Sequence, residues 1–246
     1  MPALAAIPKH MQISEILIRD ITAGRLAEGA RLPPERDLAV QMGTSVGTLR
    51  KALAHLTEQG LLHRIQGSGN YVRRGGPAAG VYAMFRLERL GGGGLPRAEI
   101  LDRGFLAKPR DLPEFGRSPE ATRFRRLRYL DDRPIAAEEI WLDAGAGRLD
   151  EGPLSESLYR SYASRLGLTI LRAEDRVRIA PFPDWTPEAL PAPGTLAGYV
   201  ERFAWGGPGA PVEYSRTWFD GTCAHYVQRL NEAAHGTGPR TEDTHD

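Results

Sequence analysis

Residues 31–53 read RLPPERDLAVQMGTSVGTLRKAL, and this stretch decides the fold of the first part of the chain. Its two prolines suit the start of a helix, because the N–H that proline lacks has no partner in a first helical turn. Gly43 ends that helix, and the Ser45 hydroxyl can cap the next one. The stretch therefore predicts two short helices around a turn.

A further helix and a hairpin flank this pair. Isoleucine and leucine recur at helical spacing over about 10–23, which predicts an amphipathic helix. The segments 61–66 and 70–74 enclose the turn Gly-Ser-Gly at 67–69, a pattern typical of a β-hairpin. Residues 1–74 are thus predicted to form three helices with a β-hairpin wing, a winged helix-turn-helix domain.

The second predicted helix of the pair presents a small, polar and basic surface. Its leucines face the bundle, so the opposite side is centred on Gly47 and Lys51, with Thr48 and Arg50 at the edges. A helix-turn-helix places such a surface in the major groove of DNA and fixes its register through phosphate contacts. The surface therefore predicts double-stranded DNA as a partner.

Composition gives this prediction modest support. The chain has 41% hydrophobic and 26% charged residues and a net charge of +1, but residues 1–75 hold ten Lys and Arg against six Asp and Glu. A basic segment of this kind favours a polyanionic partner. Cys223 is the only cysteine, which excludes an internal disulfide and a zinc-finger type of site and fits a reducing compartment.

The start of the chain indicates where the protein resides. The segment MPALAAIPKHMQ has none of the ordered features of a signal peptide. No segment approaches the roughly 20 apolar residues that span a bilayer. We expect a cytoplasmic protein without a membrane partner.

A second domain follows a break in composition. Residues 75–80 have the glycine and proline content of a linker, 81–233 alternate in the manner of strands, and the polar segment 234–246 predicts a disordered tail. The clearest elements are strands at 123–130, 135–142, 176–180, 198–205 and 212–219 and a helix at 154–166. The fold class is α+β, and an antiparallel sheet dominates the second domain.

Four consecutive glycines at 91–94 stand apart from these elements. Holding four glycines in a helix or strand costs much backbone conformational entropy, so we expect a loop. A glycine-rich cradle for a phosphate is the alternative.

Three motifs of the first domain resemble the GntR family of bacterial transcription regulators. They read LPPERDLA, TSVGTLRKAL and GLLHRIQGSGNYV, and the similarity runs from about Ile13 to Val72. The resemblance implies DNA contacts from Arg36, Ser45, Thr48, Arg50, Gln66 and Gly67.

Two positions depart from the family pattern: Val46 stands where arginine is usual and Gly47 where threonine is usual. An arginine that reads a guanine edge contributes about 1–3 kcal/mol of discrimination, so its loss predicts an altered operator. Our hypothesis is that Val46 contacts a thymine methyl and Gly47 permits close approach of the backbone, while Arg36, Arg50 and Lys51 hold phosphates. The alternative is that both residues only fill space at a helix start.

The strands of the second domain place charged groups on shared faces. Arg126 and Arg128 alternate along one strand, which suits a phosphate or carboxylate site as well as it suits a solvated edge. Glu138 lies among apolar residues of the next strand, and a buried acid needs a partner. Glu213 shares its face with hydroxyls, as in the wall of a polar pocket.

These strands and the helix at 154–166 resemble the UTRA effector-binding domain of the HutC subfamily of GntR regulators, which is related in fold to chorismate lyase. The similarity covers about 80–230 and implies a pocket for a sugar phosphate or another organic anion. The implied ligand positions are Arg126, Arg128, Glu138, Ser157, Tyr159 and Glu213, with Phe219 where a tyrosine is usual and Thr222 where an aspartate is usual.

The resulting hypothesis is a homodimeric repressor that a small metabolite releases from a palindromic operator, without catalytic residues, metal or cofactor. One alternative is a regulator whose pocket is vestigial. Another is an enzyme of chorismate-lyase-like fold, for which Cys223 and His225 are the one candidate nucleophile pair. Fold alone does not transfer activity, and we expect no enzyme.

Overall fold

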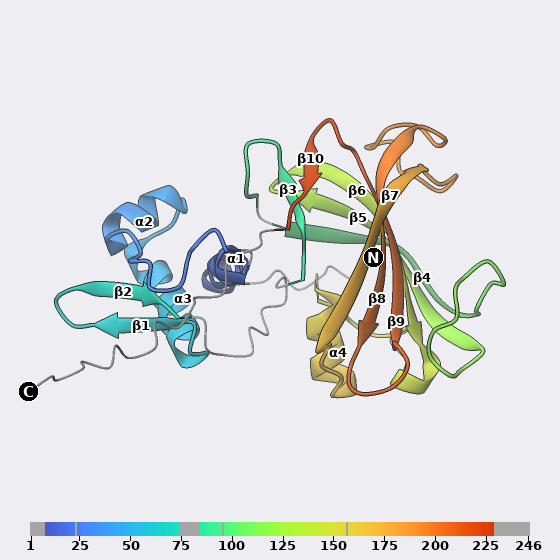
Figure 1. Ribbon diagram of the computed structural model, residues 1–246, viewed down its shortest axis with the longest axis horizontal. Coiled ribbons are helices and arrows are strands. Elements are labelled where there is room, and N and C mark those ends of the chain that lie inside the picture. Colours follow the sequence, from blue (N-terminus) through green and yellow to red (C-terminus); the bar gives the residue numbers. More distant parts are fainter. Residues whose placement is uncertain (1–7, 23, 74–83, 95, 156, 229–246) are drawn as a thin grey trace, which may run out of the picture.

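The computed structural model describes residues 8–22, 24–73, 84–94, 96–155 and 157–228. They form a helical N-terminal unit and a sheet-rich C-terminal unit that lie side by side in Figure 1. The linker at 75–80 and the tail at 234–246 that the sequence predicts lie outside the described residues.

The N-terminal unit packs three helices against a short hairpin. In chain order its elements are α1 (Lys9–Thr22), α2 (Glu35–Gln41), α3 (Val46–Glu58), β1 (Leu62–Ile65) and β2 (Gly69–Val72). One cluster of buried apolar side chains from all three helices and the hairpin holds the unit together. The predicted three helices and wing are confirmed.

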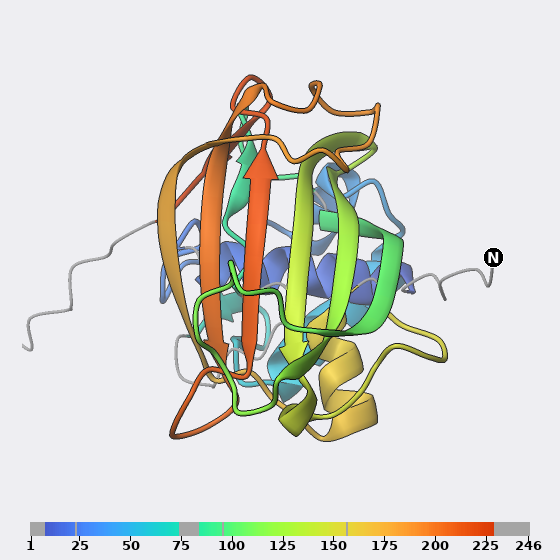
Figure 2. The same cartoon turned by 90° about the vertical axis from the view of Figure 1, so that its right-hand side faces the viewer.

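The C-terminal unit is built on a six-stranded antiparallel sheet. The strand order is β4-β5-β6-β9-β8-β7, which Figure 2 shows from green at one edge to gold at the other. The strands are β4 (Pro96–Ala107), β5 (Glu120–Leu130), β6 (Arg133–Asp143), β7 (Arg172–Pro181), β8 (Leu196–Trp205) and β9 (Glu213–Phe219). The predicted α+β class and the antiparallel sheet are confirmed.

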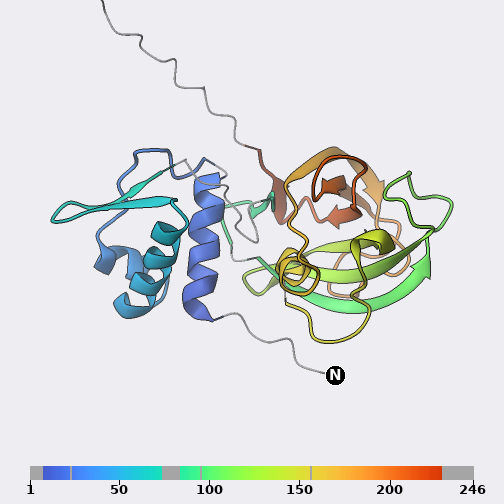
Figure 3. The same ribbon diagram turned by 90° about the horizontal axis from the view of Figure 1, so that it is seen from below.

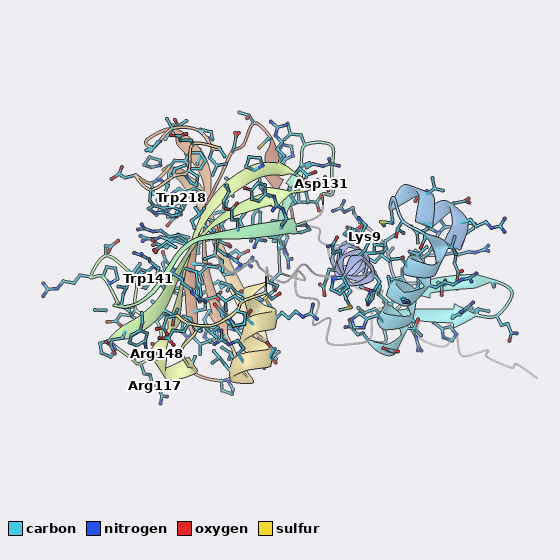
Figure 4. The ribbon with its side chains drawn as sticks, turned by 180° about the vertical axis from the view of Figure 1, so that it is seen from behind. Lys9, Arg117, Asp131, Trp141, Arg148 and Trp218 are labelled. Carbon is cyan, nitrogen blue, oxygen red and sulfur yellow. The ribbon has the colours of Figure 1, made fainter. Side chains whose placement is uncertain are left out.

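The sheet has two different faces. Its inner face is covered at one end by α4 (Leu158–Leu166), which follows the short helix η1 (Ala144–Ala146), and at the other by the pair β3 (Leu87–Arg89) and β10 (Ala224–Tyr226). The outer face, which carries Trp141 and Trp218, lies away from the N-terminal unit (Figure 4). The inner face therefore has an uncovered middle between α4 and β3.

Sequence reasoning missed β3, β4 and β10. Strand β4 carries a register shift between Ile100 and Asp102, which interrupts the alternation that marks a strand. Strands β3 and β10 have three residues each, too few for a period to show. The glycines at 91–94 form the tight turn between β3 and β4, where Gly92 donates to the Arg89 carbonyl at 2.7 Å.

Helix α1 lies between the rest of the N-terminal unit and the C-terminal unit (Figure 3). The two units meet just after it. The Arg25 guanidinium lies 2.7 Å from the Glu88 carboxylate on β3 and 3.3 Å from the Asp20 carboxylate. The side chain of Glu88 is only 6% exposed, so this ion pair is a shielded link between the units. Among the described helices, none is both long and apolar enough to cross a lipid bilayer.

Candidate functional site

The first candidate surface is the exposed side of α3 together with the tip of the wing. Ser45 caps α3, because its hydroxyl oxygen accepts from the Thr48 backbone N–H at 3.2 Å. The predicted DNA-binding residues that lie exposed on this side are Arg36, Ser45, Gly47, Arg50, Lys51, Gln66 and Gly67, while Val46 and Thr48 are half-buried. The side chains that point to solvent are thus small, polar or basic.

Arg50 already has an acidic partner within the unit. Its Nε donates to the Glu35 carboxylate of α2 at 2.6 Å, and Arg64 of the wing lies 3.9 Å from the same carboxylate. The Arg50 side chain remains 64% exposed, so this ion pair contributes little stability. Glu35 instead holds Arg50 in place beside the wing.

The structure shows what surrounds Val46 and Gly47, the two residues at the start of α3 that depart from the usual family pattern. Val46 packs in part against the core of the bundle, an intramolecular role that agrees with the space-filling alternative. A side chain at Gly47 would meet nothing closer than the Ser45 hydroxyl oxygen, 3.9 Å away. Packing therefore does not require a glycine at this position, and the close approach of DNA to it stays a prediction.

The variant Gly47→Ala separates these two roles. We expect its free energy of unfolding to be about 0.5–1 kcal/mol higher than that of the parent, because alanine loses less backbone entropy in a helix than glycine. We also expect weaker binding to an operator selected from random DNA, because the methyl group holds the helix away. Thermal unfolding and fluorescence anisotropy measure the two effects. A more stable variant with unchanged DNA affinity would contradict the close approach.

The second candidate site is a cavity of about 50 Å³ in the uncovered middle of the inner face. Its wall comes from the sheet, from α4 and from the segment that precedes β3. The lining residues are Met84, Phe85, Arg126, Arg128, Glu138, Ile140, Ser157, Leu158, Tyr159, Arg202, Glu213 and Ser215. Six of the seven predicted effector residues lie in this wall.

Two arginines share one carboxylate at the centre of the wall. Arg126 donates to the Glu138 carboxylate with two nitrogens, at 2.9 and 2.5 Å, and the Arg128 guanidinium lies 3.8 Å from the same oxygen. Burial opposes ionisation of Glu138, but the two arginines hold its pKa below the usual value. The cluster carries one more positive than negative charge when Glu138 is ionised.

A second carboxylate is held by hydroxyl groups. Tyr159 and Tyr162 of α4 donate to the two Glu213 oxygens at 3.0 and 2.6 Å. Burial raises the pKa of Glu213, while these two hydrogen bonds oppose the rise. Ser157 accepts from the Arg160 backbone N–H and so caps α4 beside the same wall.

Arg202 on β8 is a lining residue that sequence reasoning missed. It donates twice to the Asp175 carboxylate, both at 2.6 Å, and once to the Met84 backbone carbonyl at 2.7 Å. The alternation of β8 placed Arg202 on the same face as Val200 and could have revealed it. Met84 and Phe85 precede the first strand of the unit, and no sequence signal marks them.

Phe219 is the predicted effector residue that the structure does not place in the cavity. It is buried beneath β3 and β10, and its ring fills the space where a side chain at Gly198 would stand. An aromatic ring without a hydroxyl suits this apolar position. The phenylalanine therefore serves packing between the sheet and the small sheet above it.

The candidate nucleophile pair has the wrong environment for covalent catalysis. Cys223 is 4% exposed, and its thiol donates to the Asp220 carbonyl. Burial and the nearby Asp220 raise its pKa to about 11, so the reactive thiolate is suppressed at neutral pH. Within the described part of the chain, no three His, Cys, Asp or Glu side chains gather as metal ligands.

Comparison with known proteins gives a consistent result for both parts of the chain. The family described as "Bacterial regulatory proteins, gntR family" matches residues 9–72, and the UTRA domain matches residues 92–223. The HTH-type transcriptional regulator SmoD of Agrobacterium fabrum is 50% identical over 227 residues, which are 92% of this chain and 97% of that protein. The HTH-type transcriptional repressor NagR of Bacillus subtilis is 28% identical over 92% of this chain and 97% of its own length.

A solved structure of similar architecture is that of the possible transcriptional regulator YydK from Bacillus subtilis. The match covers 92% of this chain and 100% of the YydK chain, with 19% sequence identity and a TM-score of 0.49.

Proposed function

Because the chain belongs to the GntR family of transcription regulators and joins a DNA-binding helix-turn-helix to an effector-binding UTRA domain, we propose that it is a homodimeric repressor released by a small organic anion. The chain is a regulator and not an enzyme. The observation that carries the proposal is the cavity wall with three arginines, one of which bonds to the segment that leads to the DNA-binding unit.

The charges of the cavity support an anionic effector. Arg126, Arg128 and Arg202 all line it, and three carboxylates face them: Glu138 and Glu213 in the wall and Asp175, which pairs with Arg202 from outside it. Because burial raises the pKa of Glu213, that carboxyl group opposes the arginines less than the other two do. A phosphate or carboxylate can accept two parallel bonds from a guanidinium, which favours arginine in such sites. The surrounding hydroxyls of Ser157 and Ser215 suit an effector that also carries hydroxyl groups.

The size of the cavity explains how binding would change the conformation. Sites for small molecules have volumes of about 300–1,000 Å³, whereas this cavity has about 50 Å³. An effector larger than this free space has to move part of the wall outward. Met84, Phe85 and Ser157 are the lining residues outside the six-stranded sheet and the helices, and Ser157 is held as the cap of α4, so the segment of Met84 and Phe85 moves at the lowest cost.

The same segment continues into the link between the two units. Phe85 lies over the Arg128 guanidinium at 4.5 Å, and β3 begins two residues later. Glu88 of β3 holds Arg25 of the N-terminal unit. An anion that takes over Arg128 and Arg202 would thus displace Met84 and Phe85, shift β3 and change how the DNA-binding unit is held. The effector must prefer the arrangement that binds DNA poorly.

The DNA-binding side of the proposal rests on α3. The exposed side of α3 would enter the major groove, with Thr48, Arg50 and Lys51 near the bases and phosphates, and with Arg36, Gln66 and Gly67 at the flanking backbone. Two copies related by a two-fold axis predict a palindromic operator.

A screen of organic anions tests the proposal. We expect a sugar phosphate or carboxylate to raise the melting temperature and to lower affinity for operator DNA, because binding at 100 times its dissociation constant stabilises the native state by about 2.7 kcal/mol. Arg128→Ala should lose both effects, while Arg148→Ala, an exposed matched control, should retain them. If DNA binding is strong and no anion alters it, the cavity is vestigial.

A further inference from the structure

Strand β7 is an open edge of the six-stranded sheet, the gold strand in Figure 2. No described residue pairs with its outer side. Its ladder with β8 runs without a bulge from Arg172 to Pro181, whereas the other edge strand, β4, has a register shift. A long regular edge presents unpaired N–H and C=O groups to another strand. β7 is therefore the edge that is suited to sheet extension.

Apolar side chains are exposed along the inner side of this edge. Val177 and Ile179 are 53% and 70% exposed, and Leu171, directly before the strand, is 68% exposed. They share their face of the strand with Asp175, whose carboxylate bonds to the cavity residue Arg202. Three large apolar groups in line on an open edge favour a partner that covers them.

Charges on the outer face of the sheet follow a second pattern. The register of the ladders places one charged residue from each strand in a single row, with signs that alternate from one edge to the other. The row is Asp102, Arg125, Glu139, Arg216, Glu201 and Arg176. It ends at β7 with Arg176, which bonds to Glu174 of its own strand at 2.9 Å. A strand added there fits best with an acidic residue opposite Arg176, which could accept from the same guanidinium.

We infer that β7 pairs antiparallel with β7 of a second copy of this chain, with Asp175 on the two-fold axis. The inference rests on the homodimer proposed above and assigns its interface. In this register Arg176 faces Glu174 of the second copy, which continues the alternation of charge. Leu171 faces Ile179 on the other face. Moving the axis to Arg176 instead would set two arginines against each other.

The remaining pairs of this register are compatible with it. Ala173 faces Val177, which adds a second apolar pair on the inner side. Arg172 faces Arg178, but each already has a local partner: Arg172 lies 3.6 Å from the Trp205 ring, and Arg178 lies 3.3 Å from the Glu201 carboxylate. The Asp175 carboxylate on the axis is neutralised by two bonds from Arg202.

Charge reversal in the full chain tests the interface. We expect Arg176→Glu and Glu174→Arg each to weaken self-association at least tenfold in sedimentation experiments. In a homodimer of either variant, residues 174 and 176 of opposite copies carry like charges, and the two-fold axis repeats this pair. A mixture of the two variants should form a heterodimer with both pairs restored. Leu106→Lys, at an exposed apolar position on β4, is the matched control and should leave the dimer unchanged.

Cross-linking tests the register even where a charge variant folds poorly. Ala173→Cys and Val177→Cys combined in one chain should give a covalent dimer with a short bismaleimide, while the parent, whose Cys223 is buried, should not. A dimer that persists in both charge variants and does not cross-link would overturn the β7 interface, yet leave DNA binding and effector release intact. A parent that is monomeric on its operator would instead refute the proposed homodimer.

Discussion

Glu138→Gln is expected to lower the stability of the C-terminal unit by about 3 kcal/mol, or roughly 6–12 °C in melting temperature. The change removes the carboxylate that Arg126 and Arg128 share, and both guanidinium side chains are 6% exposed or less. Two buried cations without their counter-charge are costly. Asp150→Asn breaks an ion pair whose arginine is 58% exposed and should change stability by less than about 0.5 kcal/mol.

The difference in stability between the parent and Glu138→Gln depends on pH with a definite sign. The folded-state pKa of Glu138 is lowered from its ordinary value of 4.5, so the ion pair stabilises the protein fully above that pH. The stabilisation is lost as pH falls through the folded-state pKa, because the carboxyl group is then protonated in both states. Melting curves of the parent and Glu138→Gln should therefore converge in acid, and a gap that widens below pH 4.5 would contradict the buried ion pair.

Loss of the Arg25–Glu88 ion pair between the units is expected to uncouple effector binding from DNA binding. In Glu88→Gln and in Arg25→Gln the ion pair at 2.7 Å is broken, and the ratio of DNA affinities without and with effector should fall towards one. Allosteric couplings amount to about 1–3 kcal/mol, so the ratio in the parent is about 5–150. Effector binding itself should persist, because neither residue lines the cavity.

Anisotropy titrations with and without the anion measure that ratio. The double variant should resemble either single variant, since both changes break one interaction. Arg89→Gln is the control: Arg89 lies on the same strand as Glu88, but its partner Asp131 belongs to the same unit. Parent-like release in both single variants would show that the effector acts on the DNA-binding unit by another route.

The alternation of side chains explains how much of the cavity the sequence could predict. Alternation predicts that Arg126 and Arg128 share one face of their strand and that Glu138 lies on the apolar face of the next strand, and the cavity brings the three together. The same rule applied to β8 would have added Arg202. Met84 and Phe85 could not be found in this way, because they reach the cavity through an irregular segment whose path depends on β10, about 140 residues further along the chain.

The sequence by itself determined both folds and the family of this regulator, because helix caps, turn glycines and apolar periods act locally and motifs keep their spacing. Tertiary structure alone decided three matters: that Phe219 packs under β10 rather than lining the cavity, that Glu35 holds Arg50, and that Glu88 meets Arg25. Each depends on residues that folding brings together from separate elements, and no local pattern records where two such elements meet.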